Sequence, residues 1–302
     1  WIVPECHPSE VEYRKVDGTL VDKKFLSFSQ DEDEVWKELF NNQIKVVEDR
    51  VIDEFIDVFK FFDKFGGIPP IEAMNEHFME KTGWKIVPVH GLVTDGIFFR
   101  HLAQKQFPVT RFLRPTAGAS YIQAPDLFHD LFGHVPMLAD KRYTKFLELY
   151  GKLAMKAPFH MVGNKRLGAL YWYTVEFGLI ETDKGLRVYG AGIASSEGET
   201  RFALESDSPN RVYFDRDRLM DTDYFINCFQ STYHVLKSLD ELDASLLDLE
   251  KNLYQVSDQF ADRDTFQYSP IDVAGYSDDM IKHKGSLSYC AHRALDGHVF
   301  LG

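Results

Sequence analysis

The sequence predicts a mainly α-helical α+β protein with a few short strands, and three observations support this fold class. Several long stretches place apolar side chains at three- and four-residue steps, the periodicity of an amphipathic helix. Only short runs have the composition of strands, and turn residues such as Gly, Pro and Asn separate them. The 302 residues are 44% hydrophobic and 27% charged, so the chain can bury a core. Most of its 25 Phe and 14 Tyr residues are expected to pack there.

The N-terminal part of the chain is predicted to be an arm followed by helices. We assign no chemistry to the arm, residues 1–28. A capping box, Ser29-x-x-Glu32, then precedes a helical pattern that continues to Phe62. This pattern is long enough for two helices or for one bent helix. A shorter helix is expected over residues 72–81, because Gly and Pro residues interrupt the pattern on both sides.

The remaining elements alternate between helices and short strands. A strand that becomes a loop is expected from residue 84. The later elements are expected to be a helix over 98–106, an extended segment over 108–115, an amphipathic helix over 143–156, a hairpin of 179–181 and 186–189, short strands at 212–214 and 232–236, and a leucine-rich helix after a second capping box, Ser238-x-x-Glu241. Residues 258–302 are expected to form a partly ordered tail that packs on the domain or extends from it.

Charge and cysteine content exclude several classes of function. The net charge of −13 disfavours nucleic acid and anionic membrane surfaces as partners. No apolar run reaches membrane-spanning length, and no signal peptide is expected. The three cysteines, Cys6, Cys228 and Cys290, are too few and too scattered to predict disulfides or a CxxC metal site. This cysteine usage favours the reducing cytoplasm.

Two histidines, His129 and His134, stand five residues apart in the apolar segment from Pro125 to Pro136. Imidazole nitrogens suit Fe, Zn, Cu or Ni, but two ligands rarely hold a metal alone. Glu176 is the third candidate, because it is the single charge between Leu167 and Ile180 and an unpaired carboxylate there would be costly to bury. Two histidines and one carboxylate form the facial triad of non-haem Fe(II) oxygenases, and the same set serves zinc hydrolases.

The spacing of the histidines sets a condition on the helix that carries them. Five residues of a regular helix turn through about 500°, so the two side chains would point roughly 140° apart. They converge only if the helix ends or distorts between them. Gly133 permits this, and Pro136 prevents the helix from continuing. The alternative is a buried helix with two hydrogen-bonded histidines and no metal.

Three segments resemble, in the same order, the motifs of the aromatic amino acid hydroxylases. The histidine segment is similar to the H-[DE]-x-x-G-H motif of that family, and residues 171–179, YWYTVEFGL, look like its third-ligand segment. Residues 189–192, YGAG, with Ser195-Ser196 and Gly198-Glu199 after them, resemble its substrate-side loop. The resemblance covers about residues 30–255, and three motifs in order are far more specific than one.

The resemblance implies one catalytic domain, residues 29–257, of the same fold class. It implies a monooxygenase that depends on Fe(II) and tetrahydropterin and uses O2 to hydroxylate an aromatic amino acid. We expect L-phenylalanine to give L-tyrosine, because a chain that is little more than a catalytic domain is typical of the bacterial members. Tyrosine and tryptophan are the alternative substrates. No tetramer-forming coiled coil is expected, so the chain is predicted to be a monomer or weak dimer.

The resemblance also assigns residues to the pterin. Gly91, Leu92 and Val93 are expected to contact it through their backbone, and the Phe98 ring is expected to stack on it. Asp130 stands where many members have glutamate, and its shorter side chain is expected to reach the pterin through water. Without the resemblance to the family, the sequence is equally consistent with a Phe98 ring that packs in the core.

The substrate residues implied by the resemblance surround its carboxylate and its ring. Arg114 is expected to bind the carboxylate bidentately with help from Ser195, although Arg111 is a competitor for the role of Arg114. Side chains expected near the ring or the iron are Tyr121, Trp172 and Tyr171. Asp126 is expected either to accept a hydrogen bond from a metal-bound histidine ring or to cap the helix, and both interpretations can hold.

Two other functional hypotheses use the same residues. A zinc hydrolase would need the same triad, but the sequence has no H-E-x-x-H motif and no clearly placed general base near His129. A protein that binds a metal or an aromatic ligand without turnover would keep the triad and lack activity. Metal analysis together with a pterin-dependent oxygen-uptake assay discriminates among the three.

Overall fold

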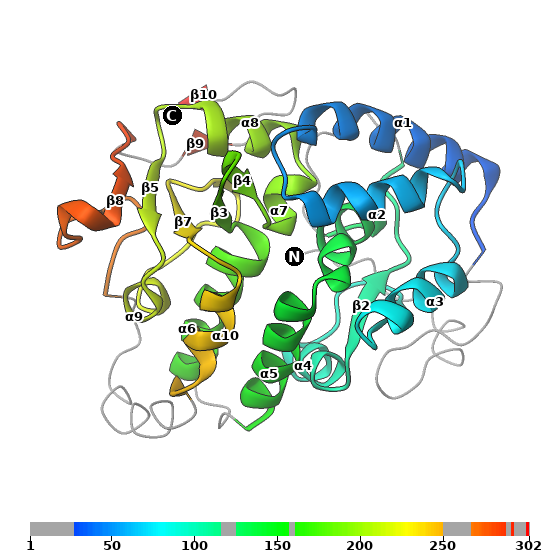
Figure 1. Cartoon of the computed structure of the whole chain (residues 1–302), viewed down its shortest axis with the longest axis horizontal. Helices are drawn as coiled ribbons and strands as arrows, with labels where there is room; N and C mark the ends of the chain where they lie inside the picture. The colour runs from blue at the N-terminus through cyan, green and yellow to red at the C-terminus, as the bar shows by residue number, and fades with distance from the viewer. Residues whose placement is uncertain are drawn as a thin grey trace. The chain divides into compact units, whose positions relative to one another are not determined.

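The computed structural model describes residues 27–115, 125–156, 161–249, 267–287, 291–292 and 300–301. The chain divides into two compact units (Figure 1). Unit 1 consists of residues 1–45 and 53–155, and unit 2 consists of residues 46–52 and 156–302. Both contain more helix than strand, which confirms the mainly α prediction. Among the described residues, no helix is both long enough and apolar enough to cross a membrane.

Unit 1 is built from helices and one pair of parallel strands. Its α-helices are α1 (Gln30–Val47), α2 (Asp53–Asp63), α3 (Ile71–Lys81), α4 (Asp95–Ala103) and α5 (Lys141–Lys156). Its strands are β1 (Lys85–Val89) and β2 (Gln106–Thr110), and between β2 and α5 lie the π-helix η3 (His129–His134) and the 3₁₀-helix η4 (Val135–Ala139). The parallel pairing of β1 with β2 is not a feature that the sequence patterns predicted.

The N-terminal helices form as the sequence predicts. The backbone N–H of Ser29 donates to the Glu32 carboxylate at 2.8 Å, and the backbone N–H of Glu32 donates to Ser29 Oγ at 3.2 Å. This reciprocal pair is the capping box. The long apolar pattern divides into α1 and α2, and Asp49 between them has a φ of 57°. A left-handed residue ends α1, which settles the prediction in favour of two helices.

Aromatic rings form the core of unit 1 and support the π-helix η3. Phe59 of α2 stacks on Phe132 with ring centroids 4.2 Å apart, and Phe132 in turn stacks on Phe128 at 5.0 Å. Trp36 of α1 meets Phe128 edge-on at 5.6 Å. All four side chains are almost fully buried. Burial of each such ring stabilises the fold by about 1.5–3 kcal/mol, so these contacts anchor the apolar side of η3.

Unit 2 contains a five-stranded mixed sheet with helices. Its helices are α6 (Met161–Tyr171), the π-helix η5 (Trp172–Glu176), α7 (Ala191–Ala194), α8 (Glu197–Glu205), α9 (Arg216–Met220), α10 (Asp240–Leu246) and the 3₁₀-helix η6 (Asp278–Met280). Its strands are β3 (Leu179–Thr182), β4 (Gly185–Val188), β5 (Asn210–Tyr213), β6 (Cys228–Phe229), β7 (Thr232–Leu236), β8 (Ile281–His283), β9 (Ala291–His292) and β10 (Phe300–Leu301).

The larger sheet has the strand order β4-β3-β7-β5-β8, and a smaller one has the order β10-β9-β6. The predicted hairpin is confirmed as β3 and β4, and Gly185 at the turn has a φ of 94°. The predicted strands β5 and β7 pair in parallel. Strand β8, from the expected tail, adds an antiparallel edge to the same sheet.

The second capping box forms differently from the prediction. The Glu241 carboxylate accepts a hydrogen bond from the backbone N–H of Lys237 at 2.8 Å, not from that of Ser238. The Ser238 hydroxyl accepts from the backbone N–H of Asp240 at 3.2 Å, which is a tight turn before α10. The leucine stripe of this helix is buried as expected, at Leu239, Leu242, Leu246 and Leu249.

The prediction of no disulfide is wrong for Cys228, which is disulfide-bonded. The other two cysteines of the chain, Cys6 and Cys290, lie outside the described residues. The spacing of the cysteines along the sequence does not predict this bond. Strand β6, which begins at Cys228, pairs with β9 more than sixty positions downstream. Strand pairing brings such distant segments together, and no local sequence signal reports it.

Candidate metal centre

His129 and His134 lie at the two ends of the π-helix η3 and face one another. Their Nε2 atoms are 3.1 Å apart, and their rings meet nearly at right angles, at 84°. His134 is buried and His129 is half-buried. The helix is therefore distorted between the two histidines, as their convergence requires. A π-helix hydrogen-bonds residues five apart, whereas an α-helix hydrogen-bonds residues four apart.

The sequence around Pro136 explains why the helix widens. A proline in the interior of an α-helix has no N–H to donate and its ring clashes with the carbonyl four residues earlier. The backbone N–H of Val135 donates instead to the carbonyl of Asp130, five residues back, and the chain then continues as the 3₁₀-helix η4. Gly133 does not adopt a left-handed φ. The distortion is thus a π-helix with a proline after it, and not a helix end at Gly133.

Glu176 ends a second π-helix, η5, in unit 2. The hydroxyl of Thr174 donates to the carbonyl of Leu170, and the backbone N–H of Phe177 donates to the carbonyl of Trp172 at 2.9 Å. A side-chain bond to a carbonyl competes with the regular ladder, which favours the wider turn. Glu176 is half-buried among apolar neighbours on the same element.

The three predicted ligands form a group that could hold a metal ion. One ligand atom from each of His129, His134 and Glu176 lies within 4.8 Å of the others. Metal–nitrogen bonds of about 2.1 Å at a right angle separate two nitrogens by about 3.0 Å, which matches the separation of the two imidazoles. A hydrogen bond between the two rings has the same length. The nearby carboxylate favours the metal, because it adds the negative oxygen donor that completes a facial triad.

Asp126 connects the histidine segment to Arg114. Its carboxylate accepts hydrogen bonds from Nε and Nη2 of Arg114 at 2.8 and 2.9 Å, and from the backbone N–H of Arg114 at 3.0 Å. It also accepts from the backbone N–H of His129 at 3.0 Å, which confirms the capping interpretation. Both side chains of this ion pair are buried, at 8% exposed for Arg114 and 0% for Asp126. The interpretation in which Asp126 binds a histidine ring stays a prediction.

Arg111, the competitor for the role of Arg114, forms a different pair. Its Nη1 and Nη2 atoms bind the two carboxylate oxygens of Glu32 at 2.6 and 3.1 Å, and its guanidinium lies 4.3 Å from the centre of the Phe28 ring. Burial alone would raise the pKa of the Glu32 carboxyl, but hydrogen bonds from Arg111 and Ser29 bring it below its ordinary value. Arg111 thus ties α1 to the segment after β2.

Residues 11–283 match the model of one protein family, the biopterin-dependent aromatic amino acid hydroxylases. The chain belongs to this family. The matched range extends beyond residues 30–255, where the three motifs lie, and it includes strand β8. The order and spacing of the motifs therefore identified the family correctly from the sequence.

Relatives with known names and structures support this membership. A phenylalanine-4-hydroxylase from Chromobacterium violaceum is 44% identical over 239 residues, which cover 76% of this chain and 78% of that protein. A crystal structure of the phenylalanine hydroxylase of that organism, with bound iron(III) and 7,8-dihydrobiopterin, has a TM-score of 0.80 at 40% identity and covers 91% of this chain and 98% of that one. Another crystal structure of that enzyme, with bound iron and phenylalanine, has a TM-score of 0.77 at 40% identity. The match covers 87% of this chain and 94% of that one.

The residues expected to contact the pterin all lie in unit 1. Gly91, Leu92 and Val93 form the loop after β1, and the Leu92 side chain is 49% exposed. Phe98 lies on α4 and meets Phe107 edge-on at 6.1 Å, and the Phe107 ring lies 4.9 Å from that of His134. One aromatic ring therefore connects Phe98 with a histidine of the pair.

Asp130, the remaining pterin candidate, has a structural contact inside unit 1. It is 7% exposed, and its carboxylate accepts a hydrogen bond from the backbone N–H of Thr110 at 2.7 Å. Thr110 is the last residue of β2, so this bond joins the end of the strand to the π-helix η3. This bond could not be predicted from a local sequence pattern, because Thr110 and Asp130 are twenty positions apart.

The structure describes most, but not all, of the residues that were expected to contact the substrate. Trp172 is the first residue of η5, and Tyr171 comes directly before it. Ser195 follows α7, and its hydroxyl donates to the carbonyl of Ala191 at 2.9 Å. Tyr121 lies outside the described residues. Sequence reasoning missed Gln230, whose side chain accepts the Trp172 indole N–H at 2.8 Å, because nothing local marks a partner 58 positions away.

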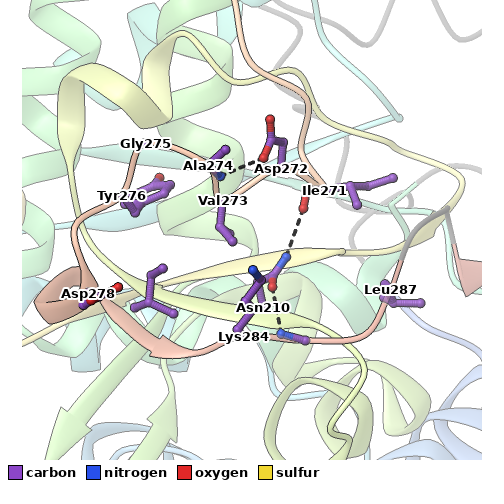
Figure 2. Close-up of a pocket in the computed structure, with 12 residues that line it drawn as sticks. Asn210, Ile271, Asp272, Val273, Ala274, Gly275, Tyr276, Asp278, Lys284 and Leu287 are labelled. Atoms are coloured by element: carbon purple, nitrogen blue, oxygen red, sulfur yellow. Dashed lines mark hydrogen bonds between the residues drawn. The ribbon is translucent and has the colours of Figure 1, made fainter.

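A separate cavity of about 360 Å³ lies in unit 2. The cavity is bordered by residues 271–276, Asp278, Ile281, Lys284, Gly285 and Leu287, and the Asn210 side chain joins the segments before and after β8 (Figure 2). Its amide donates to the carbonyl of Ile271 at 3.1 Å and accepts from the backbone N–H of Gly285 at 2.8 Å. None of the predicted site residues borders this cavity. Asn210 therefore holds the segment around β8 against the sheet.

Proposed function

We propose that this chain is a phenylalanine 4-monooxygenase that depends on Fe(II) and a tetrahydropterin and converts L-phenylalanine to L-tyrosine with O2. The observation that carries the proposal is the group of His129, His134 and Glu176, two imidazoles and a carboxylate with ligand atoms within 4.8 Å of one another. This donor set is typical of non-haem iron oxygenases. Membership of the hydroxylase family supports the pterin as the second cofactor.

In this proposal the triad holds the metal on one face and leaves its other positions open. Iron and the reduced pterin, when bound, supply the activation of O2. The chain supplies two neutral imidazoles, one carboxylate and a largely apolar surrounding. Both histidines must be deprotonated at the ligand nitrogen, so acid is expected to release the metal. Tyr171 is proposed to lie close to the iron.

Arg114 is proposed to bind the substrate carboxylate. The pair with Asp126 uses two of the five N–H donors of the guanidinium and fixes its plane. A guanidinium held in this way can orient an amino-acid carboxylate with little loss of conformational entropy. Ser195 and Tyr121 are proposed as further contacts to the substrate, and Trp172 as a wall of its ring pocket.

The pterin is proposed to bind along the loop of Gly91, Leu92 and Val93, with its ring against Phe98. The support is the exposure of the loop and the ring contacts that connect Phe98 through Phe107 to His134. Asp130 is proposed to contact the pterin through water, and its bond to Thr110 fixes its position.

An assay of oxygen uptake and tyrosine formation, with and without tetrahydropterin, tests the activity. Glu176→Ala is expected to remove most bound iron and the activity, because it deletes one of three ligands. Glu80→Ala, on the exposed surface of α3, is the matched control and is expected to keep both. Normal iron content and turnover in the Glu176 variant would contradict the ligand assignment. Hydrolysis with bound zinc and no need for pterin would contradict the monooxygenase.

The choice of substrate, the oligomeric state and the cellular location are separate parts of the proposal. Product analysis with phenylalanine, tyrosine and tryptophan decides which ring is hydroxylated. We propose a monomer or weak dimer without nucleic acid partners, supported by the net charge of −13. The proposed location is the cytoplasm, because Fe(II) and tetrahydropterin are reduced species. The disulfide at Cys228 removes the cysteine count as an argument for that location.

A further inference from the structure

The indole of Trp172 contacts two aromatic rings of unit 2. The Tyr224 ring stacks on it at 4.9 Å with an angle of 22° between the planes, and the Phe177 ring lies at 4.7 Å with an angle of 43°. Stacking restrains the plane of the indole but still allows the ring to slide between its neighbours. A further contact is needed to fix which edge of the indole Trp172 presents.

Gln230 provides that contact. The indole Nε1–H of Trp172 donates to Gln230 Oε1 at 2.8 Å. The amide nitrogen of Gln230 donates to the carbonyl oxygens of Phe225 and Cys228 at 3.1 and 3.3 Å. Because two carbonyls occupy the nitrogen end of the amide, its oxygen must point at the indole. Gln230 is 2% exposed, so water does not compete for these bonds.

A buried carboxylate holds the backbone of Gln230 in turn. The backbone N–H of Gln230 donates to Glu199 Oε1 at 3.0 Å, and the hydroxyl of Tyr233 donates to the same oxygen at 2.5 Å. Glu199 is fully buried on α8, which begins just after Ser195. One polar network therefore joins the segment after Ser195 to the wall residue Trp172. A buried network of this kind restrains its members, because breaking any of its bonds leaves a buried polar group to be desolvated without compensation.

We propose that Gln230 is a positioning residue for the aromatic substrate, and that it acts by fixing the indole of Trp172. This inference rests on the proposed function, in which Trp172 is a wall of the ring pocket. Gln230 touches neither the metal nor the substrate in this role. It determines how well the pocket holds the ring, and so it affects the affinity for phenylalanine more than the chemical step.

A double-mutant cycle of Gln230→Leu and Trp172→Phe tests the inference. Each single variant is expected to raise the KM and the calorimetric dissociation constant for phenylalanine roughly three- to tenfold, the effect of one hydrogen bond, with iron content and kcat nearly unchanged. The double variant is expected to be no worse than Trp172→Phe alone, because the bond is already absent. Should Gln230→Leu fail to fold, Gln230→Asn, which keeps the amide on a shorter side chain, replaces it.

Ser231→Ala is the matched control. Ser231 is the next residue and is 1% exposed, and its hydroxyl has no hydrogen-bond partner within the part of the chain that the structure describes. Its removal is expected to leave the affinity for phenylalanine unchanged. Independent effects that multiply in the double variant, or a Gln230 variant with the affinity of the wild type, would overturn the inference. A wild-type protein without pterin-dependent hydroxylation would instead refute the proposed function.

Discussion

At the scale of single residues, the Asp126 side chain joins the histidine pair to Arg114. One fully buried carboxylate accepts hydrogen bonds from the backbone and guanidinium of Arg114 and from the backbone of His129. Desolvation of the two charges offsets most of their attraction, so the pair adds little net stability. Its contribution is geometric, because it fixes the direction of the guanidinium relative to the start of η3.

Replacing Asp126 by Asn removes the carboxylate charge that is paired with the buried guanidinium of Arg114. We expect Asp126→Asn to lower the free energy of unfolding by roughly 3 kcal/mol, measured by urea denaturation. Glu54→Gln is the matched control, because Glu54 pairs with the half-exposed Arg142 and its removal is expected to cost less than about 1 kcal/mol. Equal losses in the two variants would show that burial does not distinguish the two pairs.

The sequence could predict the identity of the site residues but not their partners. His129, His134 and Glu176 stood out because charged or ligating side chains are rare in apolar segments. The partners of Asp130 and Trp172 are Thr110 and Gln230, twenty and 58 positions away. Contacts over such distances depend on tertiary packing, and no local pattern in the sequence reports them.

At the scale of elements, two π-helices carry the three proposed ligands. In η3, Pro136 prevents an α-helical continuation, and in η5 the Thr174 hydroxyl engages the Leu170 carbonyl. The five-residue spacing of the histidines predicts that the first helix must distort. No sequence signal predicts the second distortion, since a single Thr in a helix is usually tolerated without one.

The close approach of Gly190 to the π-helix η5 leads to a prediction about iron. A Cβ on Gly190 would lie 2.6 Å from the carbonyl oxygen of Glu176 and 2.4 Å from the backbone nitrogen of Gly178. Both are backbone atoms, so the strand end or the ligand must move. We expect Gly190→Ala to weaken iron binding by roughly tenfold or more, measured by competition with a chelator.

Gly96→Ala on α4 is the control for that substitution. A Cβ there meets no atom of the described residues within 4 Å, and alanine favours a helix over glycine by about 1 kcal/mol. The expected result is unchanged iron affinity and a slightly raised melting temperature. Loss of iron in both variants to the same extent would mean that the contact with Glu176 is not the cause.

At the scale of the whole molecule, the helices and strands were more predictable from the sequence than their arrangement. Helices α3 and α5 and the β3–β4 hairpin lie close to their predicted bounds, because periodicity and turn residues are local signals. The order of the five-stranded sheet and the place of β8 in it were not predictable, because β5 and β8 are about seventy positions apart. The disulfide at Cys228 was missed for the same reason.

The stability of the whole fold should depend on pH through His234. This residue of β7 is 2% exposed and its ring packs against Tyr173, and burial, with a smaller effect of Arg218, lowers its pKa to about 3. In the unfolded chain the pKa is near the ordinary value of a histidine, 6.5. Between these values the unfolded chain binds a proton that the folded chain does not, so stability is lost as the pH falls below about 6.5 and the loss levels off near 3.

His234→Leu removes this titration while it keeps a side chain of similar size. Between pH 6.5 and 4.5 the wild-type protein is expected to lose roughly 2 kcal/mol more unfolding free energy than the variant, since each pH unit well below 6.5 contributes about 1.4 kcal/mol. Urea denaturation of the metal-free protein measures this without interference from acid release of iron. His283→Gln, at the sheet edge where the ring bonds the Asp207 carbonyl, is expected to keep the wild-type slope. An unchanged slope in His234→Leu would mean that the acid sensitivity arises from the carboxylates instead.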